Sequence, residues 1–154
     1  MAPSTKPSEE PEKELTFADM EDCIDRSTFD QILEMDDDDD KEFSRGIVFG
    51  FFEQAENTFG KMEAALVDKN LVELSQLGHF LKGSSATLGL TKVKDACEKI
   101  QHFGAGKDET GTTDEPDDAV SLKHIKNTLA QAKKDYKKVE TFLRKLYDDS
   151  DASD

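Results

Sequence analysis

Apolar residues recur at helical spacing along most of this chain. Residues 41–67 carry a broad apolar stripe, and residues 71–88, 91–103 and 118–147 carry narrower ones. A shorter apolar face over residues 27–35 predicts a small helix before them. No segment sustains the period-two alternation of a strand. The pattern therefore predicts an all-α protein, an antiparallel four-helix bundle with an additional short N-terminal helix.

The expected helix ends coincide with residues that favour caps. Ser27 is the candidate N-cap of the small helix, Asn70 that of the third helix and Thr91 that of the fourth. Gly89 suits the position just after the third helix, where a left-handed backbone is common. Phe49 falls outside the stripe of its own helix, so either the small first helix covers it, which we favour, or it belongs to a docking patch.

One histidine lies on the polar side of its predicted helix. The apolar stripe there consists of Leu74, Leu77, Leu81 and Leu88. At about 100° per residue, His79 lies about 170° from the middle of that stripe, so its imidazole is expected in solvent. Lys82 at i+3 and Gly83 at i+4 lie beside it. A cation and a bare stretch of backbone would suit a nucleophile that must meet a bulky partner.

Charge divides the chain into a bundle and acidic ends. The formal net charge is −15 and the mean hydropathy −0.71. Acidic residues gather outside the predicted helical core, at residues 1–22, 23–40, 105–119 and 148–154. We expect a disordered acidic leader over 1–22, one domain over 23–147 with a flexible loop at about 104–117, and an acidic tail over 148–154.

Several kinds of site lack their residues. No Gly-rich phosphate loop precedes a helix and no kinase motif set is present. His79, His102 and His124 lack metal-ligand spacing. The run from Asp36 to Asp40 does not match a calcium loop, because Ile47 stands where glutamate is required. We therefore expect neither a metal nor a cofactor in this chain.

The expected surroundings are intracellular. No signal peptide or membrane span is evident in the sequence. Cys97 shares an apolar stripe, so we expect it to be a buried free thiol, which fits a reducing compartment. The lysines of the last helix have no interleaved aromatic residues, so neither nucleic acid nor a membrane is an expected partner. We expect a monomer of the cytoplasm and nucleus.

The run from His79 to Leu90, His-Phe-Leu-Lys-Gly-Ser-Ser-Ala-Thr-Leu-Gly-Leu, closely resembles the histidine-containing phosphotransfer (HPt) proteins. The resemblance is strongest to the fungal phosphorelay intermediates of osmosensing pathways. It covers about 27–104 well and the last helix loosely. Further matching segments occur in the same order and approximate spacing at residues 35–39, 43–46, 54–55, 58–59, 70–71 and 97–101.

The resemblance implies that His79 accepts a phosphoryl group from the aspartate of one receiver domain and passes it to another. The donor would be the receiver domain of a hybrid histidine kinase and the acceptor that of a response regulator. Lys82 would help to hold the phosphoryl group, Gly83 would permit close approach, and Gln101 would orient the imidazole. Magnesium is expected in the partner receiver domain, and this chain would have no kinase or ATPase activity of its own.

The resemblance also implies a docking face with an apolar patch and an acidic rim. Its positions are Ile32, Met35, Asp36, Asp39, Ile47 and Phe80. Ordinary interhelix contacts are the alternative for Ile32 and Ile47. Ala105 stands where the fungal proteins have an arginine, so either Lys107 replaces it or that contact is absent.

Two other functions stay open at this point. The chain could be a non-catalytic helical adaptor whose apolar surplus around Phe49 binds partner helices. It could also be an acidic chaperone for basic proteins. Labelled phosphate on His79 would separate phosphotransfer from both.

Overall fold

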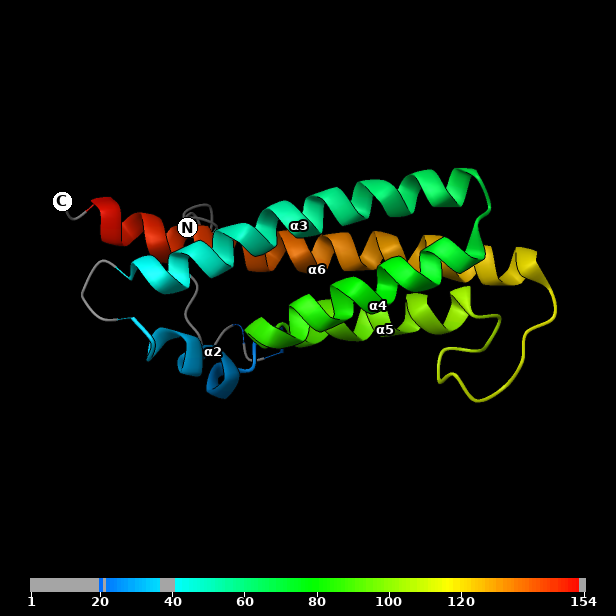
Figure 1. Cartoon of the computed structure of the whole chain (residues 1–154), viewed down its shortest axis with the longest axis horizontal. Coiled ribbons are helices and arrows are strands. Elements are labelled where there is room, and N and C mark those ends of the chain that lie inside the picture. Colours follow the sequence, from blue (N-terminus) through cyan, green and yellow to red (C-terminus); the bar gives the residue numbers. More distant parts are fainter. Residues whose placement is uncertain (1–19, 21, 37–40, 153–154) are drawn as a thin grey trace, which may run out of the picture.

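The computed structural model describes residues 20, 22–36 and 41–152, with side chains described up to residue 147. The expected leader over 1–22 lies almost entirely outside these residues, whereas residues 148–152 of the expected tail continue the last helix. The described part contains no strand, only two isolated bridges. Its helices are α2 (Arg26–Leu33), α3 (Glu42–Val67), α4 (Leu71–Leu88), α5 (Thr91–Gly104) and α6 (Asp118–Ala152) (Figure 1). The predicted all-α class is confirmed.

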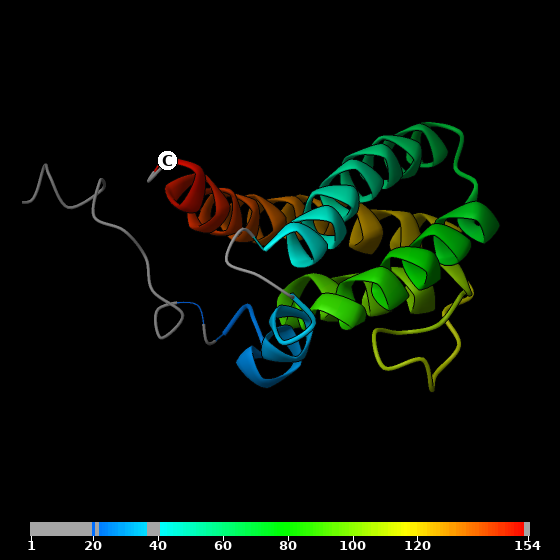
Figure 2. The ribbon, with the colours of Figure 1, turned by 60° about the vertical axis from the view of Figure 1, so that its left-hand side comes forward.

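The four longer helices lie side by side and α2 lies at one end of them (Figures 1 and 2). Contacts are most extensive between α4 and α5 and between α5 and α6, and much sparser between α3 and α6. All of these helices contribute to one core, because each turns an apolar stripe inward. Fully buried side chains include Phe29, Phe52, Met62, Leu74, Leu81, Ile100, Ile125 and Leu143.

Two glycines let α4 and α5 come together at backbone distance. A Cβ on Gly78 would lie 2.7 Å from the carbonyl oxygen of Cys97, and one on Gly104 would lie 2.6 Å from the backbone nitrogen of Ser75. The Ser75 hydroxyl donates to the carbonyl oxygen of Gln101 at 2.9 Å. This contact fixes α5 along the same stretch of α4 that contains His79.

The two caps predicted for α4 are confirmed. The Asn70 side chain accepts a hydrogen bond from the backbone N–H of Glu73 at 3.0 Å. Gly89 ends the helix with a left-handed backbone, φ 76°. Glycine suits this position because the conformation strains residues that carry a Cβ.

The caps predicted for the other two helices are wrong. The N-cap of α2 is Asp25, whose carboxylate accepts from the backbone N–H of Ser27 at 3.1 Å. The N-cap of α5 is Leu90, so Thr91 is already helical, and its hydroxyl donates to the carbonyl oxygen of Asp22 at 2.8 Å. The cap of α2 is thus a local contact, whereas the threonine predicted to cap α5 is engaged with the segment before α2.

The sequence predicted that the small helix α2 covers Phe49, and this prediction is wrong. Phe49 is covered by side chains of α6 and by Arg45 of its own helix. The Phe49 ring lies edge-on to Tyr147, with ring centroids 6.0 Å apart. The guanidinium groups of Arg45 and Arg144 lie over the ring at 5.1 and 5.3 Å from its centroid. Arg144 and Tyr147 both lie within the predicted range of this helix, and α6 itself continues to Ala152, past its predicted end at 147.

Both cysteines are free and buried, which confirms the prediction for Cys97. Burial raises the pKa of the Cys97 thiol to about 12 and also raises that of Cys23.

Within the described residues, no helix combines the length and the apolar composition needed to cross a membrane.

Candidate functional site

His79 lies in the middle of α4 with its side chain exposed, as the sequence predicted. The preceding residue, Gly78, is buried against α5, and the next, Phe80, is 50% exposed. The core side of α4 holds Leu74 and Leu81, which are fully buried. The imidazole is therefore presented outward from a helix whose position is fixed by packing on its other side.

The turn of α4 after His79 combines open backbone with a paired cation. A Cβ placed on Gly83 would meet nothing within 4 Å, so this part of the helix surface is free for a partner to approach. The Lys82 ammonium lies 3.8 Å from a carboxylate oxygen of Glu98 on α5. Glu98 was not among the predicted site residues. Its position three residues before Gln101, on the same flank of α5, is the sequence feature that could have indicated it.

Gln101 lies against the backbone that precedes His79. A Cβ on Gly78 would lie 2.9 Å from the backbone nitrogen of Gln101. The side-chain oxygen Oε1 of Gln101 is buried and has no hydrogen-bond partner among the described residues. No hydrogen bond links Gln101 to His79 within this part of the chain, so the expected orienting contact is not formed here, although its acceptor is vacant.

The predicted docking residues divide into exposed and buried ones. Met35 is 59% exposed, whereas Ile32 is buried and Ile47 is half-buried. For Ile32 the structure thus supports the interhelix alternative. Phe43, at 47% exposure, is an exposed aromatic residue of α3 that the predicted docking set omitted. Asp39 lies outside the described residues.

Asp36 is engaged in a structural contact. Its two carboxylate oxygens accept hydrogen bonds from the backbone N–H and the hydroxyl of Ser44, at 2.8 and 2.7 Å. The hydroxyl of Tyr147 in turn donates to the Ser44 oxygen at 2.8 Å. These hydrogen bonds tie the segment after α2 to α3 and α6. Sequence reasoning missed Ser44 and Tyr147, because they are 103 residues apart.

A groove opens between α3 and α4 beside Ile47. Its volume is about 360 Å³. Its lining residues are Gly46, Ile47, Gly50, Phe51, Gln54, Ser84, Thr87 and Leu88. Two glycines one turn apart leave this face of α3 open, since a Cβ at either position would meet nothing within 4 Å. A partner's side chains could enter here, on the flank of the helix that contains His79.

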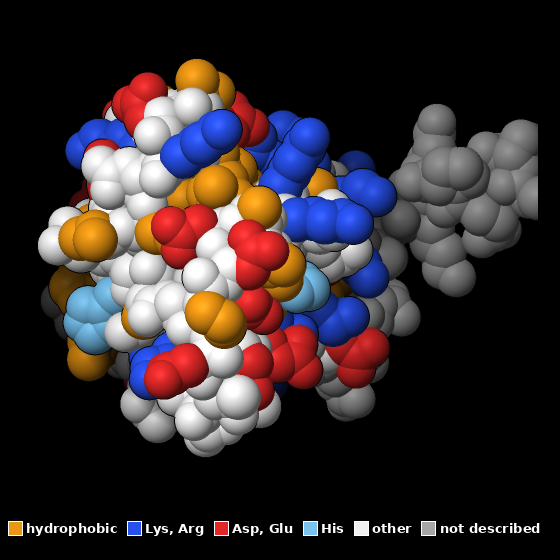
Figure 3. Space-filling model, turned by 90° about the vertical axis from the view of Figure 1, so that its right-hand side faces the viewer, with side chains coloured by type: hydrophobic (Ala, Val, Ile, Leu, Met, Phe, Trp, Pro, Cys, Tyr) orange, Lys and Arg blue, Asp and Glu red, His pale blue; other side chains and the backbone are white. Residues whose placement is uncertain are grey.

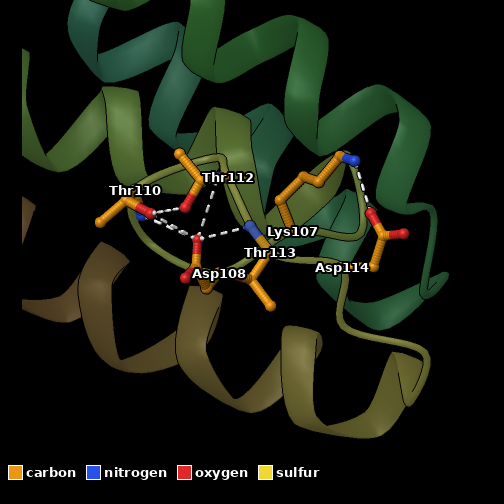
Figure 4. A network of polar contacts seen from close by, with 6 residues as sticks. All are labelled: Lys107, Asp108, Thr110, Thr112, Thr113 and Asp114. Carbon is orange, nitrogen blue, oxygen red and sulfur yellow. Dashed lines mark hydrogen bonds and ion pairs between the residues drawn. The ribbon is translucent and has the colours of Figure 1, made fainter.

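The loop from 105 to 117 is held by its own polar contacts (Figure 4). Asp108 accepts hydrogen bonds from the backbone N–H and hydroxyl of Thr110, at 3.1 and 2.7 Å. The bond from the Thr110 hydroxyl, with help from backbone N–H groups of the same loop, lowers the pKa of the Asp108 carboxyl. Lys107 forms an ion pair with Asp114 across the loop (Figure 4). The ammonium that was the candidate to replace an arginine at Ala105 is therefore turned to Asp114.

The other two histidines have structural contacts. The Nδ1 of His102 is 2.7 Å from the carbonyl oxygen of Glu109, and His124 stacks on Phe103 with ring centroids 4.9 Å apart. Within the described residues, no group of three or more His, Cys, Asp or Glu side chains could hold a metal ion.

Comparison with known proteins points to one family. The family model of the Hpt domain matches residues 47–135. The chain is 47% identical over 125 residues to multistep phosphorelay regulator 1 of Schizosaccharomyces pombe, which covers 81% of this chain and 42% of that protein. It is 49% identical over 82 residues to the phosphorelay intermediate protein YPD1 of Saccharomyces cerevisiae, covering 53% of this chain and 48% of the relative. The chain thus spans less than half the length of these two relatives.

A solved structure has the same arrangement of helices. It is the co-crystal structure of the Saccharomyces cerevisiae histidine phosphotransfer signalling protein Ypd1 with the receiver domain of its downstream response regulator Ssk1. The TM-score is 0.72 at 34% identity, covering 82% of this chain and 95% of that one. The bundle of this protein is therefore Ypd1-like.

Proposed function

Because this chain belongs to the Hpt domain family, we propose that it is a phosphorelay intermediate. It accepts a phosphoryl group on His79 from the aspartyl phosphate of one receiver domain and passes it to the aspartate of a response regulator. The observation that carries this proposal is the exposed imidazole of His79 on a helix fixed by its contact with α5. The chain itself needs no kinase or ATPase activity for this role.

The chemistry requires little from the chain beyond a positioned nucleophile. The lone pair of one ring nitrogen of neutral His79 attacks phosphorus, a P–N bond forms, and the acyl P–O bond breaks with its electrons going to the aspartate carboxylate. The second transfer reverses these steps with the next receiver domain. Such transfer depends mainly on in-line positioning and on neutralisation of the phosphoryl oxygens. A magnesium ion in the receiver domain would supply part of that neutralisation.

The neighbours of His79 suit supporting roles. Once His79 is phosphorylated, the negative phosphoryl group would compete with Glu98 for the ammonium of Lys82. The ammonium would then hold a phosphoryl oxygen. The open surface at Gly83 admits the receiver domain. The unpartnered Oε1 of Gln101 would accept a hydrogen bond from the N–H of the second ring nitrogen, which would orient the ring.

The partners follow from the same family. The yeast relative Ypd1 was crystallised with the receiver domain of its response regulator Ssk1. We propose that receiver domains also dock on this chain, over exposed Met35 and Phe80 and the groove between α3 and α4. The relay would act in osmotic stress signalling, with the chain as a monomer in the cytoplasm and nucleus.

The adaptor alternative loses the feature that suggested it. Phe49 was the surplus apolar residue proposed to bind partner helices, and it is packed under Tyr147 and two arginines. No other described feature specifically favours the adaptor over the relay.

The test is transfer of label from a phosphorylated receiver domain. The chain should acquire acid-labile, base-stable phosphate, and His79→Gln should acquire none. His124→Gln is the matched control, because it removes an exposed imidazole elsewhere in the bundle. Labelling of His79→Gln at the unmodified rate would refute the assignment.

A further inference from the structure

A second groove lies between α3 and α6 at the end of the bundle where the loop from 105 to 117 joins α6. Its volume is about 700 Å³, larger than the groove beside α4. Its lining residues are Glu63, Leu66, Val67, Lys69, Leu122, Lys123, Lys126, Leu129, Ala130 and Lys133. The proposed relay function uses none of them. No residue of α4, which contains His79, is among them.

The groove has an apolar floor that is open to solvent. Leu66 and Leu122 are half-buried, and Val67 on its edge is 81% exposed. Contacts between α3 and α6 are sparse, and the two helices separate toward this end of the bundle (Figure 1). Figure 3 shows this end face, with hydrophobic side chains gathered beside a group of lysine and arginine side chains.

The rim is basic in a protein of net charge −15. Lys133 forms an ion pair with Glu63 across the groove. Lys69, Lys123 and Lys126 have no ion pair with any carboxylate of the described residues. A surface with three uncompensated lysines around leucine side chains is complementary to a ligand that is both acidic and apolar.

We propose that this groove binds an acidic amphipathic helix of a partner protein. A groove between two helices accepts a third helix that inserts apolar side chains at i, i+3 or i+4 and i+7, here with Asp or Glu flanking them to meet the lysines. Because α4 does not line the groove, such a partner would hold the chain while His79 stays open. The site would therefore serve to tether the chain, and it does not depend on phosphotransfer.

The chain's own acidic leader is a less suitable occupant. Its apolar residues Leu15 and Phe17 lie within five residues of Met20. Met20 is buried, its carbonyl oxygen accepts from Cys23 at 2.9 Å, and Cys23 contacts the first residue of α5 through a 2.9 Å backbone hydrogen bond. That anchor is at the start of α5, whereas the groove is lined by the end of α3 and the first half of α6, which lie toward the opposite end of the bundle (Figure 1).

The probe is a fluorescein-labelled peptide of about 20 residues, designed with leucine along one helical face and glutamate beside it. Fluorescence anisotropy should give a dissociation constant in the range of about 10–100 μM, weakening as salt rises. The double variant Lys123→Glu, Lys126→Glu should bind about 10-fold more weakly or worse. The matched control is Lys134→Glu, Lys145→Glu, which changes the net charge equally on exposed residues of α6 outside the groove and should change affinity less than about twofold.

Other results would overturn the proposal. If both double variants weakened peptide binding equally, the attraction would be non-specific. If the peptide shifted amide NMR signals mainly on α2 or α4, it would bind at another site. Binding to anionic lipid vesicles without peptide binding, or peptide binding that appears only after removal of residues 1–19, would assign the groove to a membrane or to the leader. His79→Gln should bind the peptide unchanged, so failure of the relay function and failure of this proposal are distinguishable.

Discussion

Among single residues, Lys82, one helical turn after His79, is the one whose predicted role the structure changes most. Lys82 has 29% of its side chain exposed and lies 3.8 Å from Glu98. Before phosphorylation its charge is thus shared with a carboxylate on α5. A phosphoryl group on His79 would bring two negative charges to the same ammonium, which favours a stronger contact than the partly exposed pair provides.

We therefore expect Lys82→Ala to slow phosphoryl transfer about 10-fold, because the lost charge acts on the phosphoryl oxygens in the transition state. The free energy of unfolding should change by less than about 0.5 kcal/mol, since a partly exposed ion pair contributes little stability. Single-turnover transfer and urea denaturation measure the two effects. Lys99→Ala, an exposed lysine on α5, is the control, and equal transfer rates for both variants would remove Lys82 from the mechanism.

Within single elements, α4 shows how glycines in one helix can have opposite roles. Gly78 lies on the buried side, where a Cβ would be 2.7 Å from the backbone of Cys97, and Gly83 lies on the exposed side, where a Cβ would meet nothing within 4 Å. The first glycine sets the distance between α4 and α5. The second leaves the surface beside His79 bare and costs the helix intrinsic stability.

Alanine substitutions at these two positions should change stability with opposite signs. Gly83→Ala should raise the free energy of unfolding by about 0.5–1 kcal/mol, the difference in helix propensity. Gly78→Ala should lower it by about 1–3 kcal/mol, because α4 and α5 must move apart. Urea denaturation of both variants, each the control of the other, measures the effect. Stabilisation by both would show that the close contact of α4 with α5 is not needed.

For the molecule as a whole, burial of Cys97 makes stability depend on alkaline pH. Its thiol is fully buried and its pKa is raised to about 12 from the ordinary 9.0. Below pH 9 the thiol is protonated in both states. Above it, the unfolded chain loses this proton while the folded chain keeps it, so the unfolded state gains stability.

The free energy of unfolding should therefore fall between about pH 9 and 12, with a contribution from Cys97 of about 1.4 kcal/mol per pH unit. Cys97→Ala should remove this part of the slope while the titration of lysines and tyrosines, common to both chains, remains. Urea denaturation at a series of pH values measures it. Parallel curves for the two proteins would mean that the folded thiol ionises normally.

Local sequence determined most of the elements and the central residue of the site. The helical spacing of apolar residues is a short-range property, so it correctly predicted the bundle, the caps Asn70 and Gly89, and the outward side chain of His79. Lys82 and Gly83 followed from their places one turn further along α4. Gln101 entered only through the family resemblance, because spacing within one helix does not say what lies across from it.

Tertiary structure alone decided how residues far apart in the chain share contacts. It paired Lys82 with Glu98 and covered Phe49 with Tyr147. It joined Asp36 through Ser44 to Tyr147, and it formed the lysine-rimmed groove from α3 and α6. The physical reason is the same in each case. Periodicity shows which face of a helix is buried, but the neighbour on that face depends on how the helices pack and where they separate.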